Sequence, residues 1–393
     1  MNSRWLGVPL GECCEIISGS TPKSSVRSYW GGRICWATPK DLSNLSSAYI
    51  SDTPRKITEA GLRDCGASIL PAGSVLFSSR APIGHVAINT QPMATNQGFK
   101  SFVPRDGRVL AKYLYHWLRA NRHNLEALGN GATFKELSKA IVARIEIPLP
   151  PVAAQRRIAE VLDRAEALRA KRRETLARLD ELTQSIFLDM FGDPAFNRKS
   201  WPVGTVGDLL HSANYGTSAK AGSTGAFSVL RMNNITRHGE LDLTDLKYMD
   251  LDAAHHEKHL VRYGDVLFNR TNSADLVGKS AIYRRHEPMA YAGYLIRLRV
   301  NDTAEPEYLA AYLNTHRAKQ ILRKMCKSII GMANINAREV QTMKIAVPSL
   351  ALQRKFARRV EAVERVKASQ RAHLAELDSL FTSLQDRAFS GRL

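Results

Sequence analysis

Two stretches of the sequence carry residue types that could support chemistry. Residues 273–280 end in Gly278-Lys279-Ser280 like a phosphate-binding P-loop, but Ser273 stands where the first glycine is needed. Without that glycine the backbone amides cannot cradle a phosphate, so nucleotide binding is disfavoured. Residues 255–259 look like a zinc box, yet Leu260 occupies the second-histidine position of an HExxH motif. We interpret this stretch as an exposed basic segment rather than a metal site.

Other catalytic or metal-binding patterns do not stand out. The sequence has no Asn-Pro-Pro-Tyr/Phe motif of amino-methyltransferases and no carboxylate cluster typical of nucleases. Its five cysteines form no CxxC pair, which suggests neither a zinc ribbon nor a disulfide framework. With no signal-peptide pattern at the start, we expect a protein of the reducing cytoplasm. The sequence therefore disfavours an enzyme and predicts no catalytic residue, no metal and no cofactor.

The charge balance points to a polyanionic ligand. The chain has 393 residues, with 56 Lys and Arg against 37 Asp and Glu, a net charge of +19. At about 100–200 residues per domain, this length indicates two or three domains. No run approaches the roughly 18 apolar residues that would span a bilayer, so a membrane protein is excluded. Nucleic acid is the partner class that such a basic surplus most often serves.

Polar residues in glycine-rich loops are the candidate nucleic-acid contacts. Arginine can pair bidentately with guanine and asparagine with adenine, while lysine and threonine suit phosphate. The same residue types often only satisfy turn backbones, so roughly half of the candidates are expected to be true contacts. The candidates are Thr21, Lys23, Arg80 and Asn96 in the first half, and Tyr215, Thr217, Lys220, Arg231, Asn234, Arg270 and Asn272 in the second.

The two halves of the chain repeat each other. Residues 147–158 return as residues 345–356, which places Gln155 198 positions before Gln353. Two shorter repeats keep the same order: residues 72–77 resemble residues 263–268, and residues 83–88 resemble residues 277–282. An arginine, Arg80 or Arg270, follows the first of these repeats in each half. A period this long predicts a duplicated unit of one globular domain and one long helix.

Each repeat ends in a predicted long helix. Residues 152–191 contain no Gly or Pro and stop at Gly192; residues 350–389 end before Gly391. Equivalent halves predict antiparallel pairing, with Arg172 and Gln370 as polar residues that fix the register. The coiled-coil seam is expected at Ile158, Val161, Ala165, Leu168, Leu179, Leu182 and Ile186 in the first helix, and at Phe356, Val360, Val363, Leu374, Leu377, Phe381 and Leu384 in the second.

Short β-branched runs separated by turn residues predict mixed α/β, or α+β, globular domains. The runs are residues 33–36, 74–77 and 85–88 in the first half and residues 227–230, 265–268 and 295–298 in the second. We therefore expect a globular domain at residues 1–148, a central long helix at 149–193, a second globular domain at 194–346 and a C-terminal long helix at 347–393.

The chain resembles the DNA specificity subunits of type I restriction-modification systems along essentially its whole length. The most specific signs are the Pro-x-x-x-x-Gln-Arg helix entries at Pro150 and Pro348 and the segment 185–194 that closes the central helix. Residues 18–23 with 30–42 look like the opening of one type of target-recognition domain, and residues 215–221 with 229–235 look like another.

The resemblance implies a non-catalytic scaffold. Two target-recognition domains would each bind one half of a bipartite, asymmetric site in double-stranded DNA, with the long helices as spacer. The helices would dock two modification subunits, which are adenine methyltransferases that use S-adenosylmethionine, and restriction subunits, which are ATP-dependent translocases and nucleases. The docking residues expected on them are Gln155, Arg156, Gln353 and Arg354. These cofactors belong to the partners.

Two other functions remain as alternatives. One is an enzyme that acts on DNA or nucleotides with unrecognised motifs, which methyl transfer or cleavage by the isolated chain would reveal. The other is a non-specific basic nucleic-acid adaptor, which would bind DNA without regard to sequence.

Overall fold

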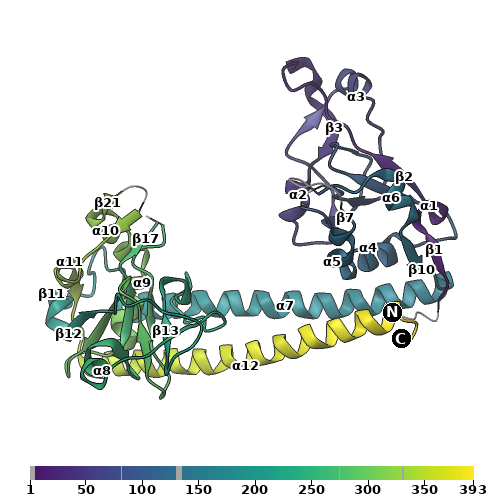
Figure 1. The fold of residues 1–393 in the computed structure, drawn as a ribbon. Helices are drawn as coiled ribbons and strands as arrows, with labels where there is room; N and C mark the ends of the chain where they lie inside the picture. The colour runs from purple at the N-terminus through teal and green to yellow at the C-terminus, as the bar shows by residue number, and fades with distance from the viewer. Residues whose placement is uncertain (1–4, 81, 130–134, 274, 330–331) are drawn as a thin grey trace. The chain divides into compact units, whose positions relative to one another are not determined.

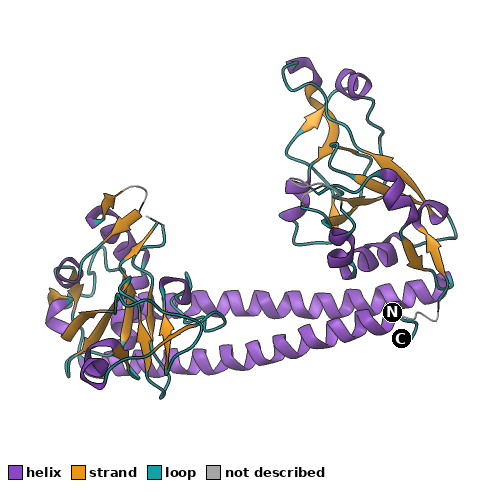
Figure 2. Ribbon diagram, viewed as in Figure 1, coloured by secondary structure: helices purple, strands orange, loops and turns teal. Residues whose placement is uncertain are grey.

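The structure is a computed structural model, and it describes residues 5–80, 82–129, 135–273, 275–329 and 332–393. The chain forms two compact units: unit 1 contains Met1–Lys171 and His373–Leu393, and unit 2 contains Arg172–Ala372. Each unit combines a globular part of mixed strands and helices with half of each long helix (Figure 2). The predicted fold class is therefore confirmed.

The two long helices are α7 (Val152–Phe191) and α12 (Leu350–Phe389), with the bounds that the sequence predicts. Within each unit their segments run side by side and antiparallel (Figure 1). In unit 1, Arg169 Nε donates to Asp378 Oδ1 at 2.5 Å. In unit 2, the guanidinium of Arg172 donates to the amide oxygen of Gln370, which confirms the pairing of the two polar seam residues.

The predicted seam is partly wrong in α7. Leu168 and Leu182 are 55% and 40% exposed, whereas Leu162 and Phe187 are buried in their place. The reason is that α7 packs against a globular part as well as against α12. Leu162 belongs to the core of unit 1, and Phe187 stacks on Tyr308 in unit 2 with ring centroids 5.6 Å apart.

Unit 1 is organised around one larger and two smaller sheets. Its strands are β1 (Gly7–Pro9), β2 (Cys14–Ser18), β3 (Trp30–Ala37), β4 (Tyr49–Ile50), β5 (Lys56–Ile57), β6 (Val75–Phe77), β7 (Val86–Asn89), β8 (Ala94–Thr95), β9 (Lys100–Pro104) and β10 (Glu146–Pro148). The sheet orders are β2-β9-β6-β7-β4, β5-β3-β8 and β1-β10. Its shorter helices are α1 (Leu10–Cys13), α2 (Pro39–Ser43), α3 (Glu59–Cys65), α4 (Ala111–Ala120), α5 (Arg122–Ala127) and α6 (Lys139–Arg144).

Unit 2 has the corresponding plan. Its strands are β11 (Val203–Thr205), β12 (Leu210–Tyr215), β13 (Phe227–Leu230), β14 (Lys247–Met249), β15 (Leu260–Val261), β16 (Val266–Asn269), β17 (Thr271–Asn272), β18 (Ser280–Ile282), β19 (Met289–Tyr291), β20 (Leu295–Val300), β21 (Lys327–Ile329), β22 (Met332–Asn334) and β23 (Lys344–Ala346). The sheet orders are β12-β20-β16-β18, β14-β13-β19-β15, β17-β22-β21 and β11-β23. Its shorter helices are α8 (His256–His259), α9 (Pro306–Asn314), α10 (His316–Met325) and α11 (Ala337–Gln341).

The cores follow the predicted strands. Each of the six β-branched runs overlaps a strand of the structure. Phe77, Phe102 and Tyr113 join the central sheet of unit 1 to α4 and the long helices, and Phe268 and Tyr308 do the same in unit 2 with α9. In the part of the chain that the structure describes, no helix is both long and apolar enough to cross a membrane.

Candidate nucleic-acid interface

Backbone hydrogen bonds hold three loops of unit 1 together. The amide of Gly19 donates to the carbonyl of Phe99 at 3.2 Å, and the amide of Ser79 donates to the carbonyl of Gly98 at 2.8 Å. We call residues 18–23, 78–80 and 95–99 the first loop cluster. The candidate contacts Thr21, Lys23, Arg80 and Asn96 all lie on it.

Unit 2 repeats this arrangement. The amide of Gly216 donates to the carbonyl of Leu295 at 3.2 Å, and the amide of Arg270 donates to the carbonyl of Tyr294 at 3.0 Å. We call residues 215–220, 270–273 and 291–295 the second loop cluster. It carries the candidate contacts Tyr215, Thr217, Lys220, Arg270 and Asn272.

A glycine pinches the backbone at the same place in both clusters. A Cβ atom on Gly19 would lie 1.9 Å from the carbonyl oxygen of Asn96, and one on Gly216 would lie 2.3 Å from that of Ala292. Because both obstacles are backbone atoms, a side chain at either glycine would force the loops apart. The two clusters therefore share one backbone frame.

Backbone hydrogen bonds show which residues correspond in the two clusters. The carbonyl of Ser79 accepts from the Leu137 amide at 2.8 Å, and the carbonyl of Arg270 accepts from the Ile335 amide at 3.0 Å. Ser79 is therefore the counterpart of Arg270, at the same offset of 191 residues that relates residues 72–77 to 263–268. The two loop clusters consequently differ in charge at this equivalent position.

The side chains of the first loop cluster are exposed to different degrees. Thr21 and Lys23 are exposed, and the Thr21 hydroxyl donates to the amide oxygen of Gln97, which is exposed as well. Arg80 is 46% exposed and lies 3.9 Å from a carboxylate oxygen of Glu136. Asn96 is half-buried, and its Oδ1 accepts from the amide of the Gly98 turn at 3.0 Å. Thr21, Lys23 and Arg80 are thus available to a ligand, whereas Asn96 shapes its own loop.

The second loop cluster presents an aromatic ring and a cation side by side. The Arg270 guanidinium carbon lies 4.9 Å from the centre of the Tyr215 ring, and Tyr215 Oη accepts from the Ala337 amide at 2.8 Å. Lys220 is exposed. Thr217 and Asn272 are half-buried, and each accepts a hydrogen bond from a nearby amide, at 3.1 and 2.9 Å. This surface suits stacking and phosphate contacts.

Two further candidates stabilise the turn after β13. Asn234 is 2% exposed; its Oδ1 accepts from the Arg231 amide at 2.8 Å and its Nδ2 donates to the Asp242 carbonyl at 2.8 Å. Arg231 Nη2 donates to Oδ2 of Asp245 at 2.7 Å. The arrangement gives Asn234 a role in the fold rather than on a DNA-facing surface, because its polar atoms are enclosed and satisfied.

Sequence reasoning missed the residues that hold the 20–23 loop. The indole of Trp36 donates to the Ser20 carbonyl at 3.0 Å, and that of Trp30 donates to the Lys23 carbonyl at 3.3 Å. The Arg55 guanidinium carbon lies 4.0 and 4.8 Å from the two ring centres. Two tryptophans six positions apart and close in sequence to a glycine-rich loop could have indicated that they hold this loop.

The residues that suggested other chemistry have roles within the fold. Lys279 of the P-loop-like stretch is 8% exposed, and its ammonium donates to the carbonyls of Met232 and Ile235 at 3.0 and 2.5 Å. Burial lowers its pKa. Residues 256–259 form α8, and among the described residues no group of three His, Cys, Asp or Glu side chains could hold a metal ion.

A buried glutamine joins α7 to the globular part of unit 1. Gln155 is 0% exposed. Its Nε2 donates to the carbonyls of Arg108 and Pro150, both at 2.9 Å, and its Oε1 accepts from the Leu110 amide at 2.8 Å. The side chain thus anchors the start of the helix and presents nothing to a partner.

Gln353 repeats these contacts at the start of α12. It is 0% exposed, donates to the carbonyls of Thr303 and Pro348 at 3.4 and 2.9 Å, and accepts from the Glu305 amide at 3.0 Å. The neighbouring Arg156 and Arg354 are exposed, and Arg354 pairs with Glu305 at 3.1 Å. The docking prediction therefore remains for the arginines, while the glutamines are structural.

Comparisons with known proteins find similarity to specificity subunits of type I restriction enzymes. The family model described as "Type I restriction modification DNA specificity domain" matches residues 2–179. The type I restriction enzyme MjaIX specificity subunit of Methanocaldococcus jannaschii is 37% identical over 213 residues, which is 50% of this chain and 49% of that protein. The chain thus spans about half the length of that relative. The EcoKI specificity subunit of Escherichia coli is 25% identical over 80% of this chain and 73% of its own.

Solved structures share the fold. A chain from a study of assembly and conformational transition in the type I R-M system aligns with a TM-score of 0.60 at 20% identity, over 99% of this chain and 98% of that one. The S subunit of a type I restriction-modification system from M. genitalium aligns with a TM-score of 0.56 at 15% identity, over 99% and 96%. Residues 2–179 are thus similar to the type I restriction modification DNA specificity domain, and the relatives named above are type I restriction enzyme specificity subunits.

Proposed function

We propose that this chain is the non-catalytic subunit that selects the DNA target of a type I restriction-modification complex. Each loop cluster would bind one half of a bipartite, asymmetric site in double-stranded DNA. The observation that carries this proposal is one backbone frame built twice with different side chains. Tyr215 and Arg270 stand where the first cluster has Ser18 and Ser79. Because base edges are distinguished by side chains, such a pair of surfaces suits two unlike half-sites.

The partners in this proposal supply the catalysis. Two adenine-methylating modification subunits, with S-adenosylmethionine, and ATP-dependent restriction subunits would assemble on the chain. The long helices would serve as docking surface and as spacer, with Arg156 and Arg354 exposed near their starts. The proposal keeps the recognition domains at residues 1–148 and 194–346 and the helical segments at 149–193 and 347–393. It also implies a location where DNA is found, the cytoplasm of a bacterial or archaeal cell.

Methylome sequencing tests the proposal. Cells that lack adenine methylation would express the modification subunits of the same system with and without this chain. We expect methylation at a single bipartite motif with a fixed gap, and only when the chain is present. Methylation at dispersed, unrelated sites would favour the basic adaptor, and methyl transfer by the purified chain alone would favour the enzyme alternative.

A substitution then assigns half-sites. Arg270→Ala is expected to relax the motif in one half and leave the other half unchanged, because Arg270 belongs to the second loop cluster alone. Arg323→Ala is a matched control, since Arg323 is 56% exposed on α10 in the same unit but is not part of the cluster. A change in both halves after Arg270→Ala would contradict the assignment of one cluster to one half-site.

A further inference from the structure

A shallow groove of about 320 Å³ lies beside the second loop cluster. One wall consists of residues 213–218, from the end of β12 and the loop that follows. The other wall consists of Lys258 and His259 at the end of α8. The short basic helix that the sequence singled out as a false metal box therefore borders the loop that carries Thr217.

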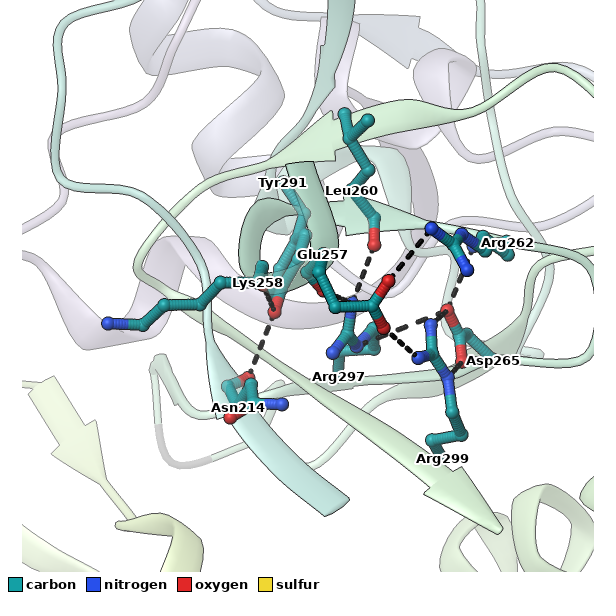
Figure 3. Close-up of polar contacts among 9 residues, drawn as sticks. All are labelled: Asn214, Glu257, Lys258, Leu260, Arg262, Asp265, Tyr291, Arg297 and Arg299. Carbon is teal, nitrogen blue, oxygen red and sulfur yellow. Dashed lines mark hydrogen bonds and ion pairs between the residues drawn. The ribbon is translucent and has the colours of Figure 1, made fainter. Parts of the chain in front are cut away.

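Buried groups fix α8 at this place. A helix of four residues is not stable by itself, so its position depends on tertiary contacts. Arg297 of β20 is 1% exposed, and its Nη1 donates to the carbonyls of Glu257 and Leu260 at 2.8 and 2.7 Å. Tyr291 of β19 donates from its hydroxyl to the carbonyl of Lys258 at 2.9 Å. Figure 3 shows both side chains meeting the backbone of α8.

The nearby carboxylates are already paired with other arginines. Asp265 accepts two hydrogen bonds from Arg299, at 2.8 and 3.0 Å. Glu257 pairs with Arg299 and with Arg262, both at 2.8 Å. The positive neighbours hold the pKa of Glu257 below its usual value, first through the Arg299 hydrogen bond. Neither carboxylate therefore neutralises Lys258.

The ammonium group of Lys258 lies outside this network. The carbonyl of Lys258 is held by Tyr291, but the Lys258 side chain points away from Arg262, Asp265 and Arg299 (Figure 3). Among the residues that the structure describes, it forms no ion pair, and Lys258 is exposed. The result is an exposed cationic side chain on a backbone that Arg297 and Tyr291 hold by hydrogen bonds, next to the loop that carries Thr217.

We propose that Lys258 binds a backbone phosphate of the DNA that flanks the half-site bound by the second loop cluster. The inference rests on the proposed function. Phosphate contacts of this kind fix the orientation of a protein on the duplex and carry no sequence information. A lysine serves as a point charge there, so the contact requires the charge rather than a particular hydrogen-bonding shape.

The salt dependence of binding tests the proposal. The full chain would be titrated with a duplex that carries the mapped motif and with a scrambled duplex, between 50 and 200 mM salt. One lost phosphate contact reduces the slope of log K against log salt by about 0.9. Lys258→Ala is expected to reduce it by that amount on both duplexes, and Lys258→Arg is expected to retain the slope of the original protein. The control Lys344→Ala, at an exposed lysine of β23, is expected to leave the slope unchanged.

The outcomes separate this proposal from the proposed function. Lys258→Ala removes no hydrogen bond of the fold, so its melting temperature should match that of the original protein. An unchanged slope in Lys258→Ala would overturn the phosphate contact, as would a loss confined to the motif duplex, since that would indicate contact with a base. If the unsubstituted chain bound both duplexes equally, the proposed function would fail instead.

Discussion

The buried glutamines allow a prediction with an internal replicate. Gln155→Ala would leave the Leu110 amide and the carbonyls of Arg108 and Pro150 without partners at a position that is 0% exposed. An unsatisfied buried group costs about 1–3 kcal/mol. Water that enters the space would restore part of this. We therefore expect unit 1 to lose about 3–5 kcal/mol of free energy of unfolding, a large share of the stability of a typical domain.

Gln353→Ala should repeat the effect in unit 2, somewhat more weakly. Its contact with the Thr303 carbonyl is 3.4 Å long, whereas Gln155 has none longer than 2.9 Å. Arg156→Ala is the matched control next in sequence to Gln155. Since Arg156 is exposed, its truncation is expected to change stability by less than about 0.5 kcal/mol.

Hydrogen exchange followed by mass spectrometry suits this test because it reports each unit separately. Faster exchange should appear in peptides of unit 1 after Gln155→Ala and in peptides of unit 2 after Gln353→Ala. A loss below about 1 kcal/mol in both variants would refute the reasoning, given the size of each unpaired group. If stability held while the modification subunits no longer co-purified, the glutamines would be docking residues after all.

Three further predictions concern charge, pH and length. The Lys367 side chain is 3% exposed, and its ammonium lies 2.6 Å from Asp180. Lys367→Met should lower the free energy of unfolding of unit 2 by about 3–5 kcal/mol, because the carboxylates beside it would stay buried without a cation. Urea unfolding measures this loss, and an unchanged midpoint would contradict the prediction. Burial lowers the pKa of His116 below its ordinary value of 6.5 despite the Asp163 partner. The unfolded chain therefore binds the proton first, and unit 1 should lose stability as the pH falls below 6.5. In His116→Gln the melting temperature should depend less on pH over that range. Seven residues inserted into each long helix at the boundary between the units lengthen each helix by about 10 Å. The methylated motif should then contain about three more unread base pairs between its halves. An unchanged gap would mean that the partners alone set the spacing.

The long helices could be predicted almost to the residue, whereas the face they bury could not. Residues 152–191 lack Gly and Pro and end at Gly192, so local propensity alone sets the bounds of α7. The seam depends on what lies around the helix. The spacing of apolar residues assumes a single partner helix, but α7 also packs against a globular part, and Leu168 therefore stays exposed while Leu162 is buried.

In the candidate site, the positions of the loops depend on the local sequence, whereas the roles of their side chains depend on tertiary contacts. Glycine-rich segments of the sequence do form loops, because the close backbone contacts at Gly19 and Gly216 leave no space for a side chain. The role of a side chain in such a loop depends on groups that lie elsewhere in the sequence. Arg231 pairs with Asp245, 14 positions later, and no local pattern distinguishes it from an arginine that faces solvent.

The position of Lys258 also depends on residues that lie far from it in the sequence. Residues 255–259 have a spacing that resembles a metal site, but the position of Lys258 beside the second loop cluster depends on Arg297, 39 positions further along the chain. A duplicated chain helps here, since backbone equivalence shows which positions correspond, as Ser79 does to Arg270. Under the proposed function, positions that share a frame but differ in side chain would distinguish the two half-sites. Substitutions exchanged between such positions should therefore alter the target without altering the fold.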